Sequence, residues 1–395
     1  MALLHIDPPG AAPHTYGGPA WLALGFRPFY LAGAAFAALA IPLWLALYYG
    51  RVAGVPLGVV WHMHEMVFGF VIAIVVGFMY TAGRNWTGLW TPRGAWLGCI
   101  AGVWLAGRVA QLLAPSLATA AIDAAFLPLA AWPMYRVLAR SGNARNMVLV
   151  VVLALLTVAN LVFHAAQLGM LAVSPLRPVY AAIILVVVIE TIIGGRVIPN
   201  FTANAVPGVK PVPRPLLERA TMLLTILAGL GWVMDVPVAL AAPLAFAAAL
   251  AQAARLALWQ PWRTLSRPIL WILHISYAWI ALGMALLGLA EMGLVTTSAA
   301  VHLLAVGALG GLIVGMITRT ALGHTGRALA AGPADVAMYV LMQLAVLARL
   351  AAALSNWQRD ALLLLAGACW SLTFLIYLAV YGPRLLAPRI DGREG

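Results

Sequence analysis

The sequence predicts an all-α, polytopic membrane protein with twelve transmembrane helices. Of its 395 residues, 64% are hydrophobic and only 9% are charged, which is too few charges to cover the surface of a soluble domain. The mean hydropathy is +0.98. Apolar runs of about 20 residues recur along the chain, and each is long enough to cross the hydrocarbon core as a helix. We therefore expect one membrane domain without a soluble module.

The connections between these runs set the domain organisation. Those near Pro115 and Asp235 are so short that the helices they join must be antiparallel hairpins. Residues 1–23 are predicted to be a cytoplasmic polar tail without a signal peptide, residues 24–383 the transmembrane domain, and residues 384–395 a cytoplasmic basic tail. The predicted spans are residues 24–49, 60–80, 94–114, 117–138, 147–170, 178–198, 216–234, 236–258, 268–290, 298–318, 334–354 and 360–382.

The net charge of +12 follows membrane topology and does not indicate a nucleic-acid partner. With twelve spans, 18 of the 23 Lys and Arg residues fall on one side of the membrane. Positive residues gather on the cytoplasmic side, so both termini are predicted to be cytoplasmic. Cys99 and Cys369 lie inside predicted spans, so neither a disulfide framework nor a cysteine metal cluster is predicted.

Two of the spans are related residue by residue. The match predicts a repeated helix that presents a His twice from the same depth. Arg-Pro pairs at positions 27–28 and 267–268 open spans 1 and 9, which extends the pattern to three four-helix units. The matching residues are His64, Gly69, Val76, Gly77, Thr87 and Gly88, which recur 238 positions later as His302, Gly307, Val314, Gly315, Thr325 and Gly326.

Four histidines are predicted to lie at one level near the outer face of the membrane: His62, His64, His164 and His302. A lone His in a membrane helix is often only a hydrogen-bonding contact between helices, and this interpretation stays open for His164 and for His274 in span 9. Neutral imidazole is also the commonest metal ligand and a frequent haem ligand. Because three of the four begin two related spans, we expect His62, His64 and His302 to bind metal or haem.

Helix geometry limits how this histidine pair can act. His62 and His64 are two residues apart, which is roughly 200° around a helix, so they cannot bind one ion from the same face. Either the segment is not helical there, or the two serve different sites. Met66 shares a face with His62, and its sulfur would suit copper, although Met usually only packs. Glu65 can accept the second N–H of a ligating imidazole or carry a proton.

Polar segments at the cytoplasmic ends of spans 2 and 10 supply further candidates. Arg84 ends span 2, and Arg319 ends span 10, where His324 follows it. Arg at a membrane boundary can pair with a haem propionate or with a lipid phosphate. It can equally be a topology signal in a polar loop. His274 and His324 complete the set of candidate metal ligands.

Several motifs together resemble the NnrS family over nearly the whole chain. The resemblance implies a bacterial inner-membrane protein that contains haem, expected to be of b type, and copper. It also implies a link to nitric oxide and to nitrosative stress, and an electron donor as a partner. The motifs are Trp61-His62-Met63-His64-Glu65-Met66, Arg84-Asn85-Trp86-Thr87-Gly88, Gly194-Gly195-Arg196-Val197-Ile198-Pro199 and Thr318-Arg319 with Gly323-His324-Thr325-Gly326-Arg327.

The helix plan also resembles the catalytic subunit of haem–copper oxidases and nitric-oxide reductases. That resemblance implies that His64, or its neighbour His62, and His302 are the two axial ligands of a low-spin haem. Spans 6 and 7 contain no His, so the three-histidine copper site of those enzymes is absent. A second metal position, with copper favoured, is expected at His62 with His164 and Met66.

Three functions stay open at this point. The chain is expected to bind or handle nitric oxide at a haem and to protect against nitrosative stress, with or without turnover as an oxidoreductase. Alternatively it is a multi-pass transporter, for which Glu190 and Arg108 are the few charged candidates near the midplane. The third possibility is a haem or copper handling factor without turnover. Optical spectra separate the transporter from the other two, and turnover with nitric oxide separates those two from each other.

Overall fold

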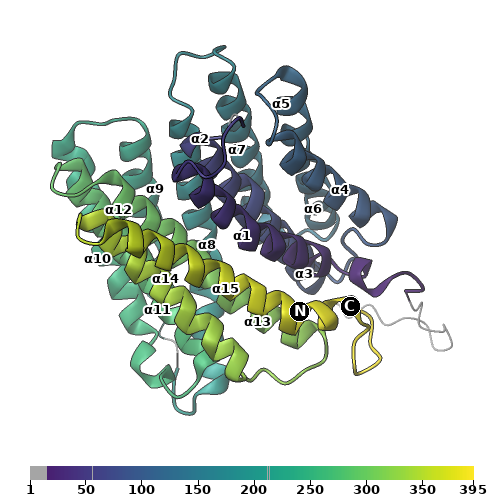
Figure 1. Ribbon diagram of the computed structural model, residues 1–395. Coiled ribbons are helices and arrows are strands. Elements are labelled where there is room, and N and C mark those ends of the chain that lie inside the picture. Colours follow the sequence, from purple (N-terminus) through teal and green to yellow (C-terminus); the bar gives the residue numbers. More distant parts are fainter. Residues whose placement is uncertain (1–15, 56, 211, 213) are drawn as a thin grey trace.

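The structure is a computed structural model that describes residues 16–55, 57–210, 212 and 214–395. Every regular element in this part of the chain is a helix. Figure 1 shows a bundle of long helices, in which α1 (Phe26–Tyr48) and α15 (Arg359–Leu386) lie side by side. Two of the histidines, His5 and His14, lie outside the described residues. The prediction of an all-α polytopic protein is confirmed.

The remaining elements follow in chain order. They are η1 (Ala20–Leu22), α2 (Val59–His64), η2 (Glu65–Val71), α3 (Ile72–Thr87), α4 (Ala95–Ala110), α5 (Leu117–Ala124), α6 (Phe126–Arg140), α7 (Ala144–Gln167), α8 (Leu176–Ala205), α9 (Pro215–Val233), α10 (Val238–Leu258), η3 (Pro261–Thr264), α11 (Pro268–Glu291), α12 (Thr297–His302), η4 (Leu303–Gly310), α13 (Gly311–His324) and α14 (Pro333–Leu354).

Eleven helical runs among the described residues are long and apolar enough to cross a membrane. Each corresponds to a predicted span, and span 4 is the pair α5 and α6. The remaining predicted span, residues 94–114, is α4, which has 16 residues and is therefore shorter than the roughly 20 residues that a perpendicular crossing needs.

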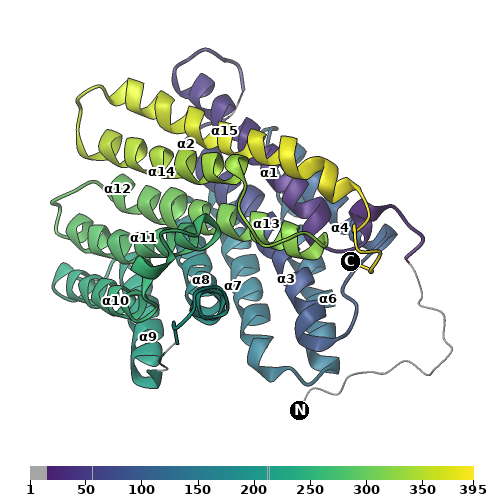
Figure 2. The same cartoon turned by 90° about the horizontal axis from the view of Figure 1, so that it is seen from below.

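The second span of each predicted four-helix unit is the most buried span of that unit. In the first unit, 89% of the most apolar stretch of Val59–Thr87 is buried inside the protein. The corresponding values are 61% for α8 and 78% for Thr297–His324. Within its own unit each of these spans is therefore the one most enclosed by other helices, although α11 of the third unit is as buried as α8. Figure 2 shows α8 seen almost end-on in the middle of the molecule.

The residue-level repeat between spans 2 and 10 is also a repeat of helix geometry. Each span starts with six α-helical residues that end at His64 or His302, and each continues as a π-helix, η2 or η4, before returning to α-helix. A π-helical turn holds an extra residue and is frequent at functional sites. The middle unit lacks this feature, because α8 is a regular α-helix throughout.

Equivalent glycines let the preceding helix pack closely on each repeated span. A Cβ on Gly77 would lie 2.8 Å from the Cβ of Phe29 in α1, and one on Gly315 would lie 2.7 Å from Leu273 in α11. Both distances are too short for real Cβ contacts. The repeat therefore preserves a helix–helix contact as well as a sequence pattern.

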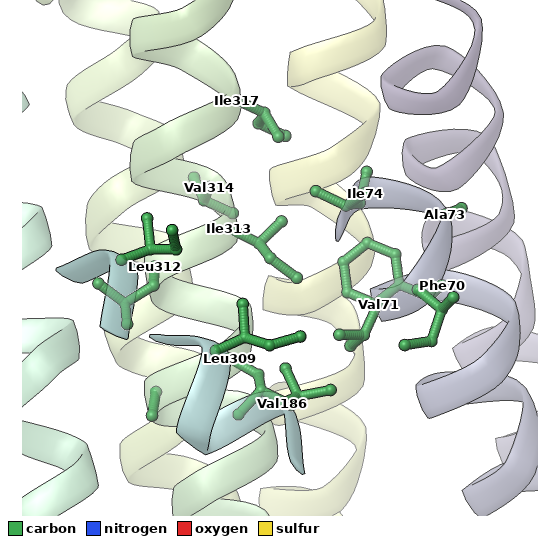
Figure 3. Close-up of a cluster of buried hydrophobic side chains, with 14 of the residues drawn as sticks. Phe70, Val71, Ala73, Ile74, Val186, Leu309, Leu312, Ile313, Val314 and Ile317 are labelled. Carbon is green, nitrogen blue, oxygen red and sulfur yellow. The ribbon is translucent and has the colours of Figure 1, made fainter. Parts of the chain in front are cut away.

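Apolar side chains fill the space between the repeated spans. Figure 3 shows Val71 and Ile74 of the first repeat, Leu309 and Ile313 of the second, and Val186 of α8 in one cluster. All five are buried to 8% exposure or less. This layer holds the two central helices and α8 at fixed positions.

The two segments predicted as tails are partly structured where they are described. Leu22 of η1 is buried, and its carbonyl accepts a hydrogen bond from the Gly94 amide at 2.8 Å. Arg27 is fully buried and donates to the carbonyls of Leu385 and Ala387, each at 2.7 Å. The carbonyls at the end of a helix have no hydrogen-bond partner within that helix, and Arg27 supplies one for the end of α15. Helix α15 therefore continues to Leu386, three residues beyond the predicted end of the transmembrane domain at residue 383.

Candidate functional site

A cavity of about 360 Å³ lies between the beginnings of the two repeated spans. His62 and His302 both line it, one from each repeat. Arg349 of α14 and Arg359 of α15 are the two cationic residues of its lining. The rest of the wall is mostly apolar and includes Ile41, Trp44, Leu45, Met63, Met66, Val67, Phe70, Ala305, Leu309, Leu363 and Trp370.

The two imidazoles of this cavity are held differently. Nδ1 of His302 lies 2.8 Å from the Ser298 carbonyl, which can only accept, so Nδ1 carries the proton. Nε2 of His302 is then the basic nitrogen, the form that ligates a metal. His62 instead stacks on Trp44 with 4.8 Å between ring centroids and 7° between planes. Its buried Nδ1 has no hydrogen-bond partner among the described residues.

The two arginines sit at the partly exposed side of the cavity. Arg349 donates to Ser298 Oγ at 2.9 Å, and Arg359 donates to Tyr48 Oη at 3.3 Å. Both contacts leave further N–H groups of each guanidinium free to bind an anion. The cavity can therefore accept a large apolar molecule whose anionic groups point toward α14 and α15.

A buried polar cluster lies on the other face of the same helix. We define it as His64, Glu65, Arg108, Asp123, Asn160 and His164, drawn from α2, η2, α4, α5 and α7, all with 5% exposure or less. His64 is central: its Nδ1 lies 2.9 Å from Glu65 Oε1, and its Nε2 lies 2.9 Å from Asn160 Oδ1 and 3.4 Å from Asp123 Oδ2.

Asp123 connects the two histidines of the cluster. Its Oδ2 lies 2.8 Å from His164 Nε2 and accepts a hydrogen bond from Asn160 Nδ2 at 2.9 Å. Its Oδ1 pairs with Arg108, which also pairs with Glu65 Oε1. Two carboxylates thus face one guanidinium. If both histidines are neutral, the cluster carries a net charge of −1 inside the protein.

Local structure explains why this cluster can assemble. Asp123 lies near the end of α5, just before the chain passes into α6. The π-helical η2 leaves the Gly69 carbonyl to accept a hydrogen bond from Trp104 Nε1 of α4 at 2.9 Å. A Cβ at Gly69 would lie 2.8 Å from the Arg108 guanidinium, so only glycine leaves room for this arginine.

The structure places the predicted histidines in two separate groups. His62 and His302 share the cavity, with Met66 on the same wall. His64 does not line that cavity and instead joins His164 in the cluster. Of the two geometric alternatives, the segment is helical and its two histidines serve different sites. The expected set of His62, His164 and Met66 is not assembled, because His164 faces Asp123.

The other predicted ligands lie away from both groups. His274 is buried between Leu270 O at 3.2 Å and Thr202 Oγ1 at 3.3 Å, which is a contact between helices. His324 packs its ring against Phe26, with centroids 5.6 Å apart. Neither residue lines the cavity or joins the cluster. Their contacts fit the interpretation of hydrogen-bonding and packing residues.

Arg84 and Arg319 lie at the far ends of the two repeated spans. They are 22 and 17 residues from His62 and His302, or about 33 and 25 Å along a helix axis. Arg84 stacks over Trp90 at 4.2 Å, and Arg319 over Phe201 at 3.8 Å. Neither can reach a group bound at the cavity, and pairing of these arginines with a haem propionate or a lipid phosphate stays a prediction.

Sequence reasoning missed Asp123 and Asn160 and treated Arg108 only as an isolated charge. Asp123 lies within an apolar run, and an ionisable residue inside a membrane span is costly unless it is paired or functional. The position of Asp123 in an apolar run could therefore have marked it as a candidate. The sequence does not show that α5 and α7 bring Asp123 and His164 next to His64.

Comparison with known families agrees with this architecture. A family model described as NnrS protein matches residues 20–389. The chain belongs to the NnrS family. The match includes both repeated spans, the cavity and the whole polar cluster. Among curated proteins, none is similar enough in sequence to count as a match. Membership links this membrane protein to nitric oxide and leaves its cofactors and reaction to be argued from the site.

Proposed function

We propose that this protein holds a haem in the cavity between His62 and His302 and handles nitric oxide there. The observation that carries the proposal is that two imidazoles from repeat-equivalent helices line one apolar cavity. Haem iron is commonly held by imidazole, and its macrocycle requires an apolar pocket. Haem of b type, which has no covalent link to the chain, is the expected form.

The residues present fit such a group. Ser298 fixes the ring of His302 with Nε2 as the ligating nitrogen. Arg349 and Arg359 are the cations that would pair with the two propionates, in place of Arg84 and Arg319. Trp44, Phe70 and Trp370 supply flat apolar walls. When bound, haem iron supplies the affinity for nitric oxide.

The two histidines are expected to have unequal roles. Ser298 anchors His302, whereas His62 has only the stacking contact with Trp44 and no hydrogen-bond partner among the described residues. His62 can therefore turn away from the cavity at little cost in polar contacts. We propose that His302 is the constant ligand and that His62 is the one that makes room for nitric oxide.

Optical spectroscopy of the purified protein tests this proposal. The native protein is expected to show a six-coordinate low-spin haem spectrum, which changes when nitric oxide is added to the reduced form. His302→Ala is expected to lose most of the haem, and His62→Ala to keep haem but give a five-coordinate spectrum. His274→Ala is the matched control, since it removes a buried membrane histidine outside the cavity. Native protein without haem would refute the proposal and favour the transporter.

The physiological part of the proposal is protection against nitrosative stress in a bacterial inner membrane. A deletion strain is expected to grow more slowly than its parent when nitric oxide is supplied. Complementation with the native gene should restore growth, and complementation with His302→Ala should not. Equal growth of all strains would leave nitric-oxide binding without a protective role. An electron donor is required only if the bound nitric oxide is reduced.

Copper is the second cofactor that we propose. In the cavity, His62 and Met66 offer one nitrogen and one sulfur ligand. The expected third ligand, His164, lies outside the cavity and contacts Asp123. We therefore place copper outside the cavity. Metal analysis of the native protein is the measurement, and a preparation that contains haem but no copper would remove copper from the proposal.

A further inference from the structure

We propose that His64, Asp123 and His164 form a metal site of two imidazoles and one carboxylate, separate from the cavity. Its expected occupant is a divalent first-row transition metal ion. The inference rests on the proposed function only in that copper is one candidate ion. It depends on neither the haem nor the role of His62 and His302.

The three donor atoms are already close together. Ligand atoms of His64, Asp123 and His164, one from each residue, all lie within 4.8 Å of one another. Bonds of about 2.0–2.2 Å place neighbouring ligand atoms roughly 3–3.5 Å apart. The two distances to Asp123 Oδ2, 3.4 Å from His64 and 2.8 Å from His164, are near that range. Small side-chain rotations therefore suffice for binding.

The surrounding residues orient the donors as metal sites require. Glu65 accepts from His64 Nδ1 at 2.9 Å, and Nε2 on the opposite side of the ring faces Asn160 Oδ1 at 2.9 Å and Asp123 Oδ2 at 3.4 Å. A carboxylate on the outer nitrogen of a ligating histidine is the usual supporting contact, and it makes the ligand more basic. Arg108 holds Asp123 by Oδ1 and leaves Oδ2 for the ion.

Charge balance gives an independent reason for a cation at this point. Glu65 and Asp123 contribute two negative charges and Arg108 one positive charge, at 5% exposure or less. A buried net charge is costly, so the cluster needs a further positive charge. A divalent metal ion with a bound hydroxide between the donors supplies a net single positive charge. A proton on His64, whose Nδ1 faces Glu65 Oε1 and whose Nε2 faces Asn160 Oδ1, would also supply it, and this is the competing explanation that the experiment must separate.

The donor types select the class of metal. The site offers nitrogen and oxygen and no sulfur, and imidazole suits copper, zinc and iron. Two histidines and one carboxylate with open positions also form the usual site of non-haem ferrous iron. Among divalent ions of this row, affinity is greatest for copper. Cu²⁺, Fe²⁺ and Zn²⁺ are therefore the ions to test.

The test measures metal and haem separately on full-length protein in detergent. Native protein, as isolated and after incubation with each ion followed by desalting, is expected to hold about one ion per chain in this site. His164→Asn keeps a hydrogen-bond donor toward Asp123 and is expected to lower metal affinity at least about ten-fold. Asp123→Asn should do the same. His274→Ala is the matched control and should retain the metal.

The outcomes are distinct for the two proposals. Loss of metal in His164→Asn and Asp123→Asn with an unchanged haem spectrum supports the site, and a changed electron paramagnetic resonance signal in Cu²⁺-loaded protein supports it directly. If Asp123→Asn does not fold, His164→Asn and His164→Ala decide the matter, since both keep the Arg108 pairs. Native protein that takes up none of the three ions overturns the proposal in favour of a proton on His64. Retention of the metal in folded His164 variants also overturns it. Absence of haem alone would refute only the proposed function.

Discussion

His62 and His64 show how two neighbouring residues come to serve different chemistry. The helix turns them roughly 200° apart, so one imidazole enters the apolar cavity and the other enters the polar cluster. Asn160 and Asp123 lie beside Nε2 of His64, while Trp44 stacks on the ring of His62. Residue spacing therefore determines that the sites are separate, and the neighbours determine what each site can hold.

Arg108 is the residue on which the polar cluster depends most. Arg108→Ala would leave Glu65 and Asp123 facing each other without a counter-charge. Removing one partner of a buried ion pair typically costs about 3–5 kcal/mol, and we expect a loss of this size. Thermal unfolding in detergent measures it. Arg177→Ala is the control, because its exposed pair with Asp235 should contribute at most about 1 kcal/mol. Equal losses in both variants would contradict this account.

At the scale of the elements, the π-helical turns are what distinguish the two repeated spans from ordinary membrane helices. Each begins directly after the repeated histidine, His64 or His302. The extra residue in a π turn displaces the helix before it relative to the helix after it. The first residues of each span can thus contact their site while the rest of the span packs closely on the preceding helix. Gly77 of the first span packs on α1, and Gly315 of the second packs on α11.

Gly77 provides the test of this packing. Gly77→Ala places a methyl group 2.8 Å from the Phe29 Cβ, so α1 must shift. Overpacking of this kind typically costs about 1–3 kcal/mol. Gly102→Ala in α4 is the control, because nothing lies within 4 Å of its added Cβ. Unfolding temperatures of the two variants are compared in the same detergent. A Gly77→Ala protein as stable as Gly102→Ala would show that α1 does not need this close approach.

At the scale of the whole molecule, three central spans are surrounded by helices with lipid-facing sides. The charge distribution predicts that both termini are cytoplasmic, and this prediction requires that α4 crosses the membrane with its 16 residues. The histidine end of the bundle would then face outward. This topology would expose the cavity and the cluster to nitric oxide and metal ions from the periplasmic side.

Reporter fusions after Arg51 and after Gly208 test the topology. The first site follows one span and the second follows six, so we expect the two to report opposite sides of the membrane. If α4 does not cross, only five crossings precede Gly208, and both fusions would report the same side. A fusion after Ile390 should agree with the cytoplasmic side. The enzymatic reporter that works only in the periplasm should be active at Arg51 alone.

The sequence by itself determined the fold class, the number of apolar runs and the repeat between spans 2 and 10. These follow from composition and from helical periodicity, which are local properties of the chain. Tertiary structure decided which side chains meet. It brought His62 and His302 to one cavity, placed Arg349 and Arg359 in the lining of that cavity, and brought Asp123 and His164 to His64. Such contacts join residues far apart in the chain, as in the hydrogen bond from Arg359 to Tyr48, which are 311 positions apart. They depend on how whole helices pack, which spacing along one helix does not encode.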